Sequence, residues 1–201
     1  SNGQLNVPLL VRAPMGLVKC AGAHHSGAYY PSFAHCPGLI VVVPSTPADA
    51  KGLMKTSLRA GDPVLFLEHK ALFSSKGEVP AGEHLVPLGQ AAVVRPGTDL
   101  TIATCGLLTR VCLEAAEQLS QKGVSCEVID LRTIVPLDVE TVAASLHKTQ
   151  HLLVVEAPVG GAARQQLVVR PLLNDPSARD HRDPAGAADR RQAVRDHQRR
   201  P

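Results

Sequence analysis

Two short apolar runs on either side of a helix-length segment constrain this chain more than any other feature. Residues 39–43 (LIVVV) and 64–67 (VLFL) have the length and the β-branched composition of buried strands. Between them, Ser45 or Thr46 can cap a helix that runs to about Arg59. A helix that joins two strands in this way is a crossover connection, which makes the strands parallel. The sequence therefore predicts an α/β fold.

The same alternation recurs on both sides of this unit. Towards the N-terminus, residues 7–12 (VPLLVR) predict a buried strand that ends at Pro14 and Gly16, and residues 29–35 predict a short helix. Towards the C-terminus, strands at residues 100–104, 124–130 and 152–156 alternate with an amphipathic helix at 109–121 and a second helix at 139–147. We expect two three-layer α/β/α units with mainly parallel sheets.

Composition divides the chain into four parts. Residues 1–69 and 98–163 carry the two α/β patterns, whereas residues 70–97 are rich in Ser, Gly and Pro and are expected to be an interdomain linker. Residues 164–201 hold nine Arg and five Asp with few apolar side chains, which predicts a disordered basic tail. A basic arm for nucleic acid is the alternative, but the interspersed Asp and the lack of aromatic residues disfavour it.

Several classes of function are disfavoured by composition. The chain has three Phe, two Tyr and no Trp, so a nucleic-acid platform of stacked aromatic rings is not expected. Its five cysteines form no CxxC pair, which indicates reduced thiols and a cytoplasmic protein. No apolar run approaches the roughly 20 residues that a membrane span needs, and the first residues, SNGQLN, carry no signal pattern.

The stretch 21–38 (AGAHHSGAYYPSFAHCPG) is the candidate site. It follows one expected strand and precedes the next, and it is expected to be a loop to about Gly27. Ligands bind at the carboxyl edge of open parallel sheets, so chemistry is expected here. Thiolate and imidazole groups also suggest zinc, with Cys20, His24, His25, His35 and Cys36 as the ligands. Side chains of adjacent residues rarely reach one ion and no CxxC pair is present, so we expect no metal site.

Longer strings carry a resemblance to a known family. They include VPLLVRAPMG, FAHCPGL, VVVPSTPADAKGLMKTSLRAGDPVLFLEHKALF, PLGQAAVVRPGTDLTIATCG and VSCEVIDLRTIVPLD. Over residues 7–161 the chain closely resembles the beta subunit of thiamine-diphosphate-dependent 2-oxo acid dehydrogenases, the pyruvate, branched-chain and acetoin enzymes. The resemblance implies the C-terminal part of a thiamine pyrimidine-binding domain followed by a transketolase C-terminal-like domain, incomplete at both ends.

The resemblance also implies a function and partners. A beta subunit of this type shares thiamine diphosphate with an alpha subunit, which holds Mg²⁺, and it pairs with a second beta subunit. The complex decarboxylates a 2-oxo acid oxidatively and passes the acyl group to a lipoyl-bearing acyltransferase. Such a protein is cytoplasmic, or lies in the mitochondrial matrix of a eukaryote.

The one catalytic residue that the resemblance assigns is His25, which matches the histidine of the family's HS motif and is followed here by Ser26. Its imidazole can donate a proton to the lipoyl sulfur or stabilise an oxyanion. His24 and Gly27 stand where many relatives have Gln. The cofactor-binding Glu of relatives precedes the VPLLVR strand, so no residue here is assigned to the cofactor.

Two other functions remain open. The chain can be a non-catalytic fragment or interaction module with the same fold, which agrees with our expectation that it has no turnover alone. It can also be a thiamine enzyme of the transketolase or deoxyxylulose-phosphate synthase type, although the strings FLEHKALF and GEVP disfavour that reading.

Overall fold

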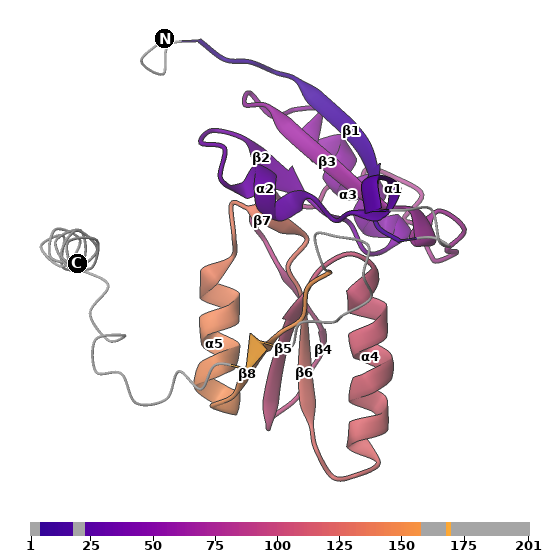
Figure 1. The fold of residues 1–201 in the computed structure, drawn as a ribbon, viewed down its shortest axis with the longest axis vertical. Coiled ribbons are helices and arrows are strands. Elements are labelled where there is room, and N and C mark those ends of the chain that lie inside the picture. Colours follow the sequence, from indigo (N-terminus) through magenta and orange to yellow (C-terminus); the bar gives the residue numbers. More distant parts are fainter. Residues whose placement is uncertain (1–4, 18–22, 158–167, 170–201) are drawn as a thin grey trace, which may run out of the picture. The chain divides into compact units, whose positions relative to one another are not determined.

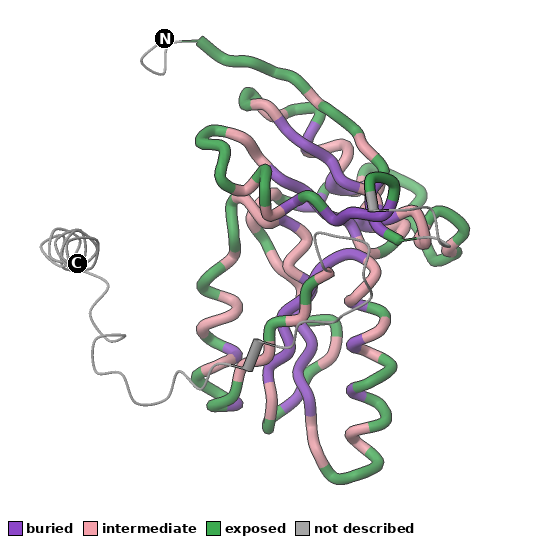
Figure 2. The backbone as a smooth tube through the Cα atoms, viewed as in Figure 1, coloured by how far each residue is buried: buried purple, intermediate pink, exposed green. Residues whose placement is uncertain are grey.

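The computed structural model describes residues 5–17, 23–157 and 168–169 (Figure 1). These residues build two sheets, a four-stranded sheet of order β1-β3-β2-β7 and a five-stranded sheet of order β4-β6-β5-β8-β9. Buried residues are concentrated on the inner strands of both sheets, as Figure 2 shows. Among the residues that the structure describes, no helix has the length and apolarity to cross a membrane.

Three parallel strands form most of the first sheet. β1 (Leu10–Met15) and β2 (Ile40–Val42) both pair in parallel with β3 (Val64–His69). Helix α3 (Pro47–Ser57) makes the crossover from β2 to β3. The hydroxyl of Thr46 caps it by accepting a hydrogen bond from the Asp49 N–H at 3.1 Å. The predicted strand, helix, strand unit is therefore confirmed.

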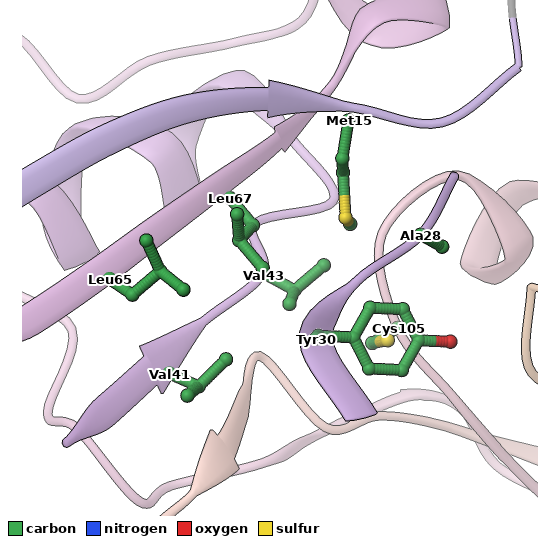
Figure 3. Close-up of a cluster of buried hydrophobic side chains, with 8 residues drawn as sticks. All are labelled: Met15, Ala28, Tyr30, Val41, Val43, Leu65, Leu67 and Cys105. Carbon is green, nitrogen blue, oxygen red and sulfur yellow. The ribbon is translucent and has the colours of Figure 1, made fainter. Parts of the chain in front are cut away.

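The sheet is covered on both faces because successive strand residues point to opposite sides. Val41, Val43, Leu65 and Leu67 pack on one face with Met15, Ala28, Tyr30 and Cys105, as the close-up in Figure 3 shows. Val42, Val64 and Phe66 pack on the other face with Leu53 of α3. The predicted helix at residues 29–35 is also confirmed, as α2 (Tyr30–Ala34).

β1 differs from the prediction in its bounds and its burial. It begins at Leu10 rather than Val7 and continues through Pro14. It is the edge strand of its sheet, and Val11 is 44% exposed. An edge strand tolerates proline because part of its backbone has no partner strand. The expectation that the strand is buried was wrong, since burial depends on neighbours that the run itself does not specify.

The fourth strand of the first sheet comes from the second half of the chain. β7 (Thr133–Val135) pairs antiparallel with β2, and the Val43 N–H donates to the Arg132 carbonyl at 2.8 Å. The sequence did not predict this strand, because three residues before a proline carry no periodic pattern. The second half thus completes the sheet of the first half.

The second sheet has the predicted β-α-β-α-β order. β5 (Leu100–Thr104) pairs in parallel with both β6 (Cys126–Asp130) and β8 (Leu152–Val154). Helices α4 (Leu107–Ser120) and α5 (Val139–Thr149) are the crossovers, and the Asp138 carboxylate caps α5 by accepting from the Thr141 N–H at 3.0 Å. Two mainly parallel α/β units, as predicted, are therefore confirmed.

The two helices cover opposite faces of β5. The Thr101 hydroxyl lies 2.6 Å from the hydroxyls of both Ser145 and Thr149 on α5. The next residue, Ile102, packs in a cluster with Cys112 and Ala116 of α4. This alternation gives the three-layer arrangement that the sequence predicted.

Residues 70–97 are more ordered than a linker. They contain the 3₁₀ turn η1 (Lys70–Leu72) and strand β4 (Ala92–Arg95), which pairs antiparallel with β6. The irregular part between them packs on α3, with Glu83 accepting from Lys55 and Arg59 at 2.9 Å each. The linker expectation is corrected for these residues, because short polar segments can be ordered by contacts with distant elements.

The expected disordered tail, residues 164–201, contains one described element. β9 (Val168–Val169) pairs antiparallel with β8. This pairing was not predicted, because the sequence does not locate the sheet edge that these two residues join. The rest of the tail lies outside the described residues.

Candidate active site

The carboxyl ends of β1, β3 and β2 meet at one edge of the first sheet, because the three strands are parallel. Gly16 follows β1, Lys70 follows β3, and Ser45 stands just beyond β2. Helix α1 (Ala23–Ser26) carries His24 and His25 and was expected to be a loop. The structure therefore places polar and ionisable groups from separate segments near one sheet edge, which is where open parallel sheets bind ligands.

The candidate catalytic residue His25 is exposed beside a second exposed imidazole. The ring centroids of His24 and His25 lie 4.2 Å apart with the planes tilted by 46°. The residues that follow, Ser26, Gly27 and Ala28, are buried. The two imidazoles thus stand on the solvent side of a turn whose other end is packed into the protein.

Two backbone contacts fix this turn. The Gly16 N–H donates to the Gly27 carbonyl at 3.1 Å, and the Lys70 ammonium donates to the His25 carbonyl. Residue 16 lies next to β1 and residue 70 next to β3, so both contacts start from the ends of paired strands. Sequence reasoning missed Gly16 and Lys70, because nothing in the local pattern joins them to His25.

A buried histidine supports the same corner of the fold. His69 is 6% exposed and its Nδ1 accepts from the Ala71 N–H at 3.2 Å, so the proton of the neutral ring sits on Nε2. Burial lowers the pKa of His69, and the nearby Lys70 charge lowers it further. A neutral ring is therefore expected near pH 7.

Gly16 cannot be replaced by a larger residue without displacing the His69 ring. Its φ of +84° is strained for any residue with a Cβ, and a Cβ there would stand 2.1 Å from His69 Nε2. We expect Gly16→Ala to lower the free energy of unfolding by about 2–4 kcal/mol, from backbone strain and displacement of the ring together. Urea denaturation followed by circular dichroism measures this loss.

Gly38 provides the matched control for that substitution. Its φ is +78°, but a Cβ there would meet no atom within 4 Å. Gly38→Ala therefore isolates the backbone strain, at about 1–2 kcal/mol. Equal losses for the two variants would show that the His69 ring does not constrain residue 16.

A cleft of about 400 Å³ opens at the same edge, near the start of α3 and the turn η1. Its polar lining includes Arg12, Ser45, Thr46, Glu68 and His69. The Glu68 carboxylate is bound by two nitrogens of the Arg12 guanidinium, with Nη2 at 3.0 Å from Oε1. His25 is not among the residues that line this cleft, so the cleft is not part of the candidate site around His25.

The zinc alternative finds no support in the described residues. Among residues 5–17, 23–157 and 168–169, no group of three His, Cys, Asp or Glu side chains could hold a metal ion. Cys20 lies outside the described residues. His35 is the exposed C-cap of α2, and its neighbour Cys36 is also exposed.

Comparison with known families identifies two domains. Residues 1–76 match the transketolase pyrimidine-binding domain, and residues 89–168 match the transketolase C-terminal domain. The fold is also similar to a solved split-gene transketolase, described as an inactive beta4 tetramer. The TM-score is 0.65 at 24% identity, over 76% of this chain and 48% of that chain. That likeness concerns the fold.

Curated relatives give the family more narrowly. The chain is 46% identical to the beta subunit of acetoin:2,6-dichlorophenolindophenol oxidoreductase from Cupriavidus necator, over 77% of this chain and 46% of the relative. It is 46% identical to the beta subunit of 2-oxoisovalerate dehydrogenase from Bacillus subtilis, over 77% of this chain and 48% of the relative. It is 44% identical to the pyruvate dehydrogenase beta subunit of the same organism, over 78% and 48%.

The chain thus spans about half the length of the curated relatives that it matches. Within that half, both domain matches and all three relatives agree with the strings that carried the resemblance. The chain therefore consists of a transketolase pyrimidine-binding domain followed by a transketolase C-terminal domain, and over both it is similar to the beta subunits of pyruvate dehydrogenase, 2-oxoisovalerate dehydrogenase and acetoin:2,6-dichlorophenolindophenol oxidoreductase.

Proposed function

We propose that this chain is the beta component of a thiamine-diphosphate-dependent 2-oxo acid dehydrogenase complex. The complex decarboxylates a 2-oxo acid oxidatively and transfers the acyl group to a lipoyl arm. The observation that carries the proposal is the exposed His25, held at the carboxyl edge of a parallel sheet in a chain 42–47% identical to such beta subunits. An alpha subunit, a second beta subunit and a lipoyl-bearing acyltransferase are the proposed partners.

The cleft at this sheet edge offers no free carboxylate for thiamine activation among the described residues. Activation of thiamine needs a carboxylic acid against the aminopyrimidine ring. The carboxylate that lines the cleft at this edge, Glu68, is committed to the Arg12 guanidinium. The contacts to thiamine are therefore proposed to come from outside the described residues, and the alpha subunit is proposed to hold the diphosphate and Mg²⁺.

His25 is proposed to act in proton transfer. Its ring is exposed, so a lipoyl arm can approach it from solvent. When the acyl group moves to one lipoyl sulfur, the other sulfur becomes a thiolate that takes up a proton, and an imidazolium can supply that proton. The proposed location is the cytoplasm, or the mitochondrial matrix in a eukaryote. The name of a relative from Dictyostelium discoideum describes that relative as mitochondrial.

The test separates the two halves of the reaction. The chain is mixed with an alpha subunit of the same family, thiamine diphosphate and Mg²⁺, and offered pyruvate, 2-oxoisovalerate or acetoin. Dichlorophenolindophenol reduction reports electron release from the substrate, whereas acylation of a lipoyl domain reports the transfer step. We expect His25→Ala to slow lipoyl acylation by about 10²–10⁴-fold and to slow dye reduction less.

His35→Ala is the matched control, because His35 is another exposed histidine of the same stretch, on the C-cap of α2. We expect it to leave both rates unchanged. A folded wild-type chain with no activity on any substrate would favour the non-catalytic fragment. Equal acylation rates for His25→Ala and the wild type would remove His25 from the mechanism.

A further inference from the structure

We propose that Lys70 is a positioning residue for His25, and that its ammonium group fixes the orientation of the exposed imidazole through the His25 main-chain carbonyl. The inference rests on the proposed role of His25. It adds a residue that acts through another group and does not touch the substrate.

Helix α1 cannot fix His25 by itself. It has four residues, Ala23–Ser26. The last carbonyls of any helix lack intrahelical partners, so a helix as short as α1 leaves most of its carbonyls to be satisfied from outside. Helices of this length are also unstable on their own. The direction of the His25 side chain must therefore come from contacts that α1 makes with the rest of the protein.

The described contacts reach α1 and the residues after it from one side. The Lys70 ammonium donates to the carbonyl of His25, and the Gly16 N–H donates to the carbonyl of Gly27 at 3.1 Å. Beyond them, the side chains of Ser26 and Ala28 are buried. Of the two hydrogen bonds, the one from Lys70 ends on the backbone of His25, so Lys70 is the group best placed to set that ring.

Lys70 is itself held on a rigid base. It follows the last residue of β3 and begins the turn η1, which the buried His69 caps by accepting from the Ala71 N–H. The His69 ring in turn lies against Gly16, the residue that follows β1. The Lys70 backbone is therefore fixed by paired strands, and its long side chain spans to the turn that carries His25.

This role differs from general stabilisation. Lys70 is partly exposed, so replacing it removes little buried surface. Its bond ends on a single exposed turn, so its loss is expected to loosen that turn and leave the cores unchanged. A misplacement of about 1 Å in a catalytic group can cost about 10²-fold in rate. A large kinetic effect with a small effect on global stability is therefore the signature of this residue.

The experiment compares Lys70→Met, which keeps the length but loses the donor, with Lys70→Arg, which keeps a charged donor. Lys76→Met is the matched control, because Lys76 is exposed on the same segment. Hydrogen exchange of the full chain, read by mass spectrometry, measures opening of residues 23–28. Lipoyl acylation in the assembled enzyme measures the kinetic consequence.

We expect Lys70→Met to speed exchange in residues 23–28 by about tenfold or more and to slow lipoyl acylation by about 10–100-fold. Exchange in the strands should not change. Lys70→Arg should restore both values to within about threefold of the wild type, and Lys76→Met should match the wild type.

Unchanged exchange in Lys70→Met would overturn the proposal, and so would a failure of Lys70→Arg to restore exchange. The exchange measurement needs no turnover. If the variant loosens residues 23–28 while the wild-type complex is inactive, the contact stands and the proposed function fails. If the complex is active and exchange is unaffected, the function stands and the role of Lys70 is lost.

Discussion

Arg132→Met should lower the free energy of unfolding by about 3 kcal/mol or more, because the buried Asp49 carboxylate loses its charged partner and keeps only the neutral hydrogen bond from the Thr46 hydroxyl among the described contacts. Arg132 Nη2 lies 2.7 Å from Asp49 Oδ1, and the Asp49 side chain is 7% exposed. Asp49 stands in the first turn of α3, whereas Arg132 follows β6. The pair therefore ties α3 to the strand segment that completes the first sheet, and urea denaturation of the full chain measures its effect.

Arg110→Met is the matched control for the loss of a guanidinium. On the exposed face of α4, Arg110 Nε lies 4.0 Å from Glu114 Oε1, and both side chains are more than half exposed. Such a surface pair contributes about 0.5 kcal/mol or less. A double-mutant cycle with Asp49→Asn completes the test. Additive losses for Arg132→Met and Asp49→Asn would show that the two groups do not interact.

Asp130→Asn should stabilise the chain above neutral pH and flatten its pH dependence. Asp130 is fully buried, and burial, aided by the Asp49 charge, raises its pKa to about 7 against the opposing effects of the Ser45 side chain and of the Arg132 N–H and guanidinium. Oδ2 has no hydrogen-bond partner among the described residues. Above neutral pH the folded state must therefore bury a carboxylate that is only half satisfied.

The sign follows from which state binds the proton. An unfolded Asp loses its proton near pH ~4, so between there and the folded pKa of about 7 the folded chain binds more protons. The contribution of Asp130 to stability is thus present below pH ~4, falls as the pH rises, and is lost above about 7, a total on the order of a few kcal/mol. The amide that Asp130→Asn introduces keeps an acceptor for the Arg132 N–H and has no proton to lose.

Urea denaturation at pH 5, 6, 7 and 8 provides the measurement. We expect the difference between Asp130→Asn and the wild type to grow in favour of the variant across this series. Asp62→Asn is the control, because Asp62 is an exposed carboxylate that follows α3. Parallel pH profiles for Asp130→Asn and the wild type would contradict an elevated Asp130 pKa.

The sequence predicted those elements whose signal is local. The β-branched run at 39–43 and the pattern at 100–104 became β2 and β5, because strand length and composition are readable from neighbouring residues. The helix expected at residues 139–147 became α5 for the same reason. β4 and β7 were missed, since each forms only by pairing with a strand more than 30 residues away.

In the candidate site, too, the residue that stands in a recognisable string was predicted, and the residues that reach it across the fold were not. His25 was found because it stands in a string that resembles a known family. Its supports, Gly16 and Lys70, were not found, because each reaches the turn across the tertiary structure. The buried Asp130 was also missed, because its carboxylate lies in a run whose composition predicts an ordinary strand. Only the fold shows that the Arg132 guanidinium pairs with Asp49 rather than with Asp130.

The strand β7 also sets an order of events during synthesis. Val41 of β2 pairs with Val135, so the first sheet waits for a residue that leaves the ribosome 94 positions later (135 − 41). Until then β2 has an open edge, on which another nascent or unfolded chain can pair. Contacts of such long sequence separation slow folding. While translation continues, β2 is thus open to pairing with other chains until residue 135 has been made.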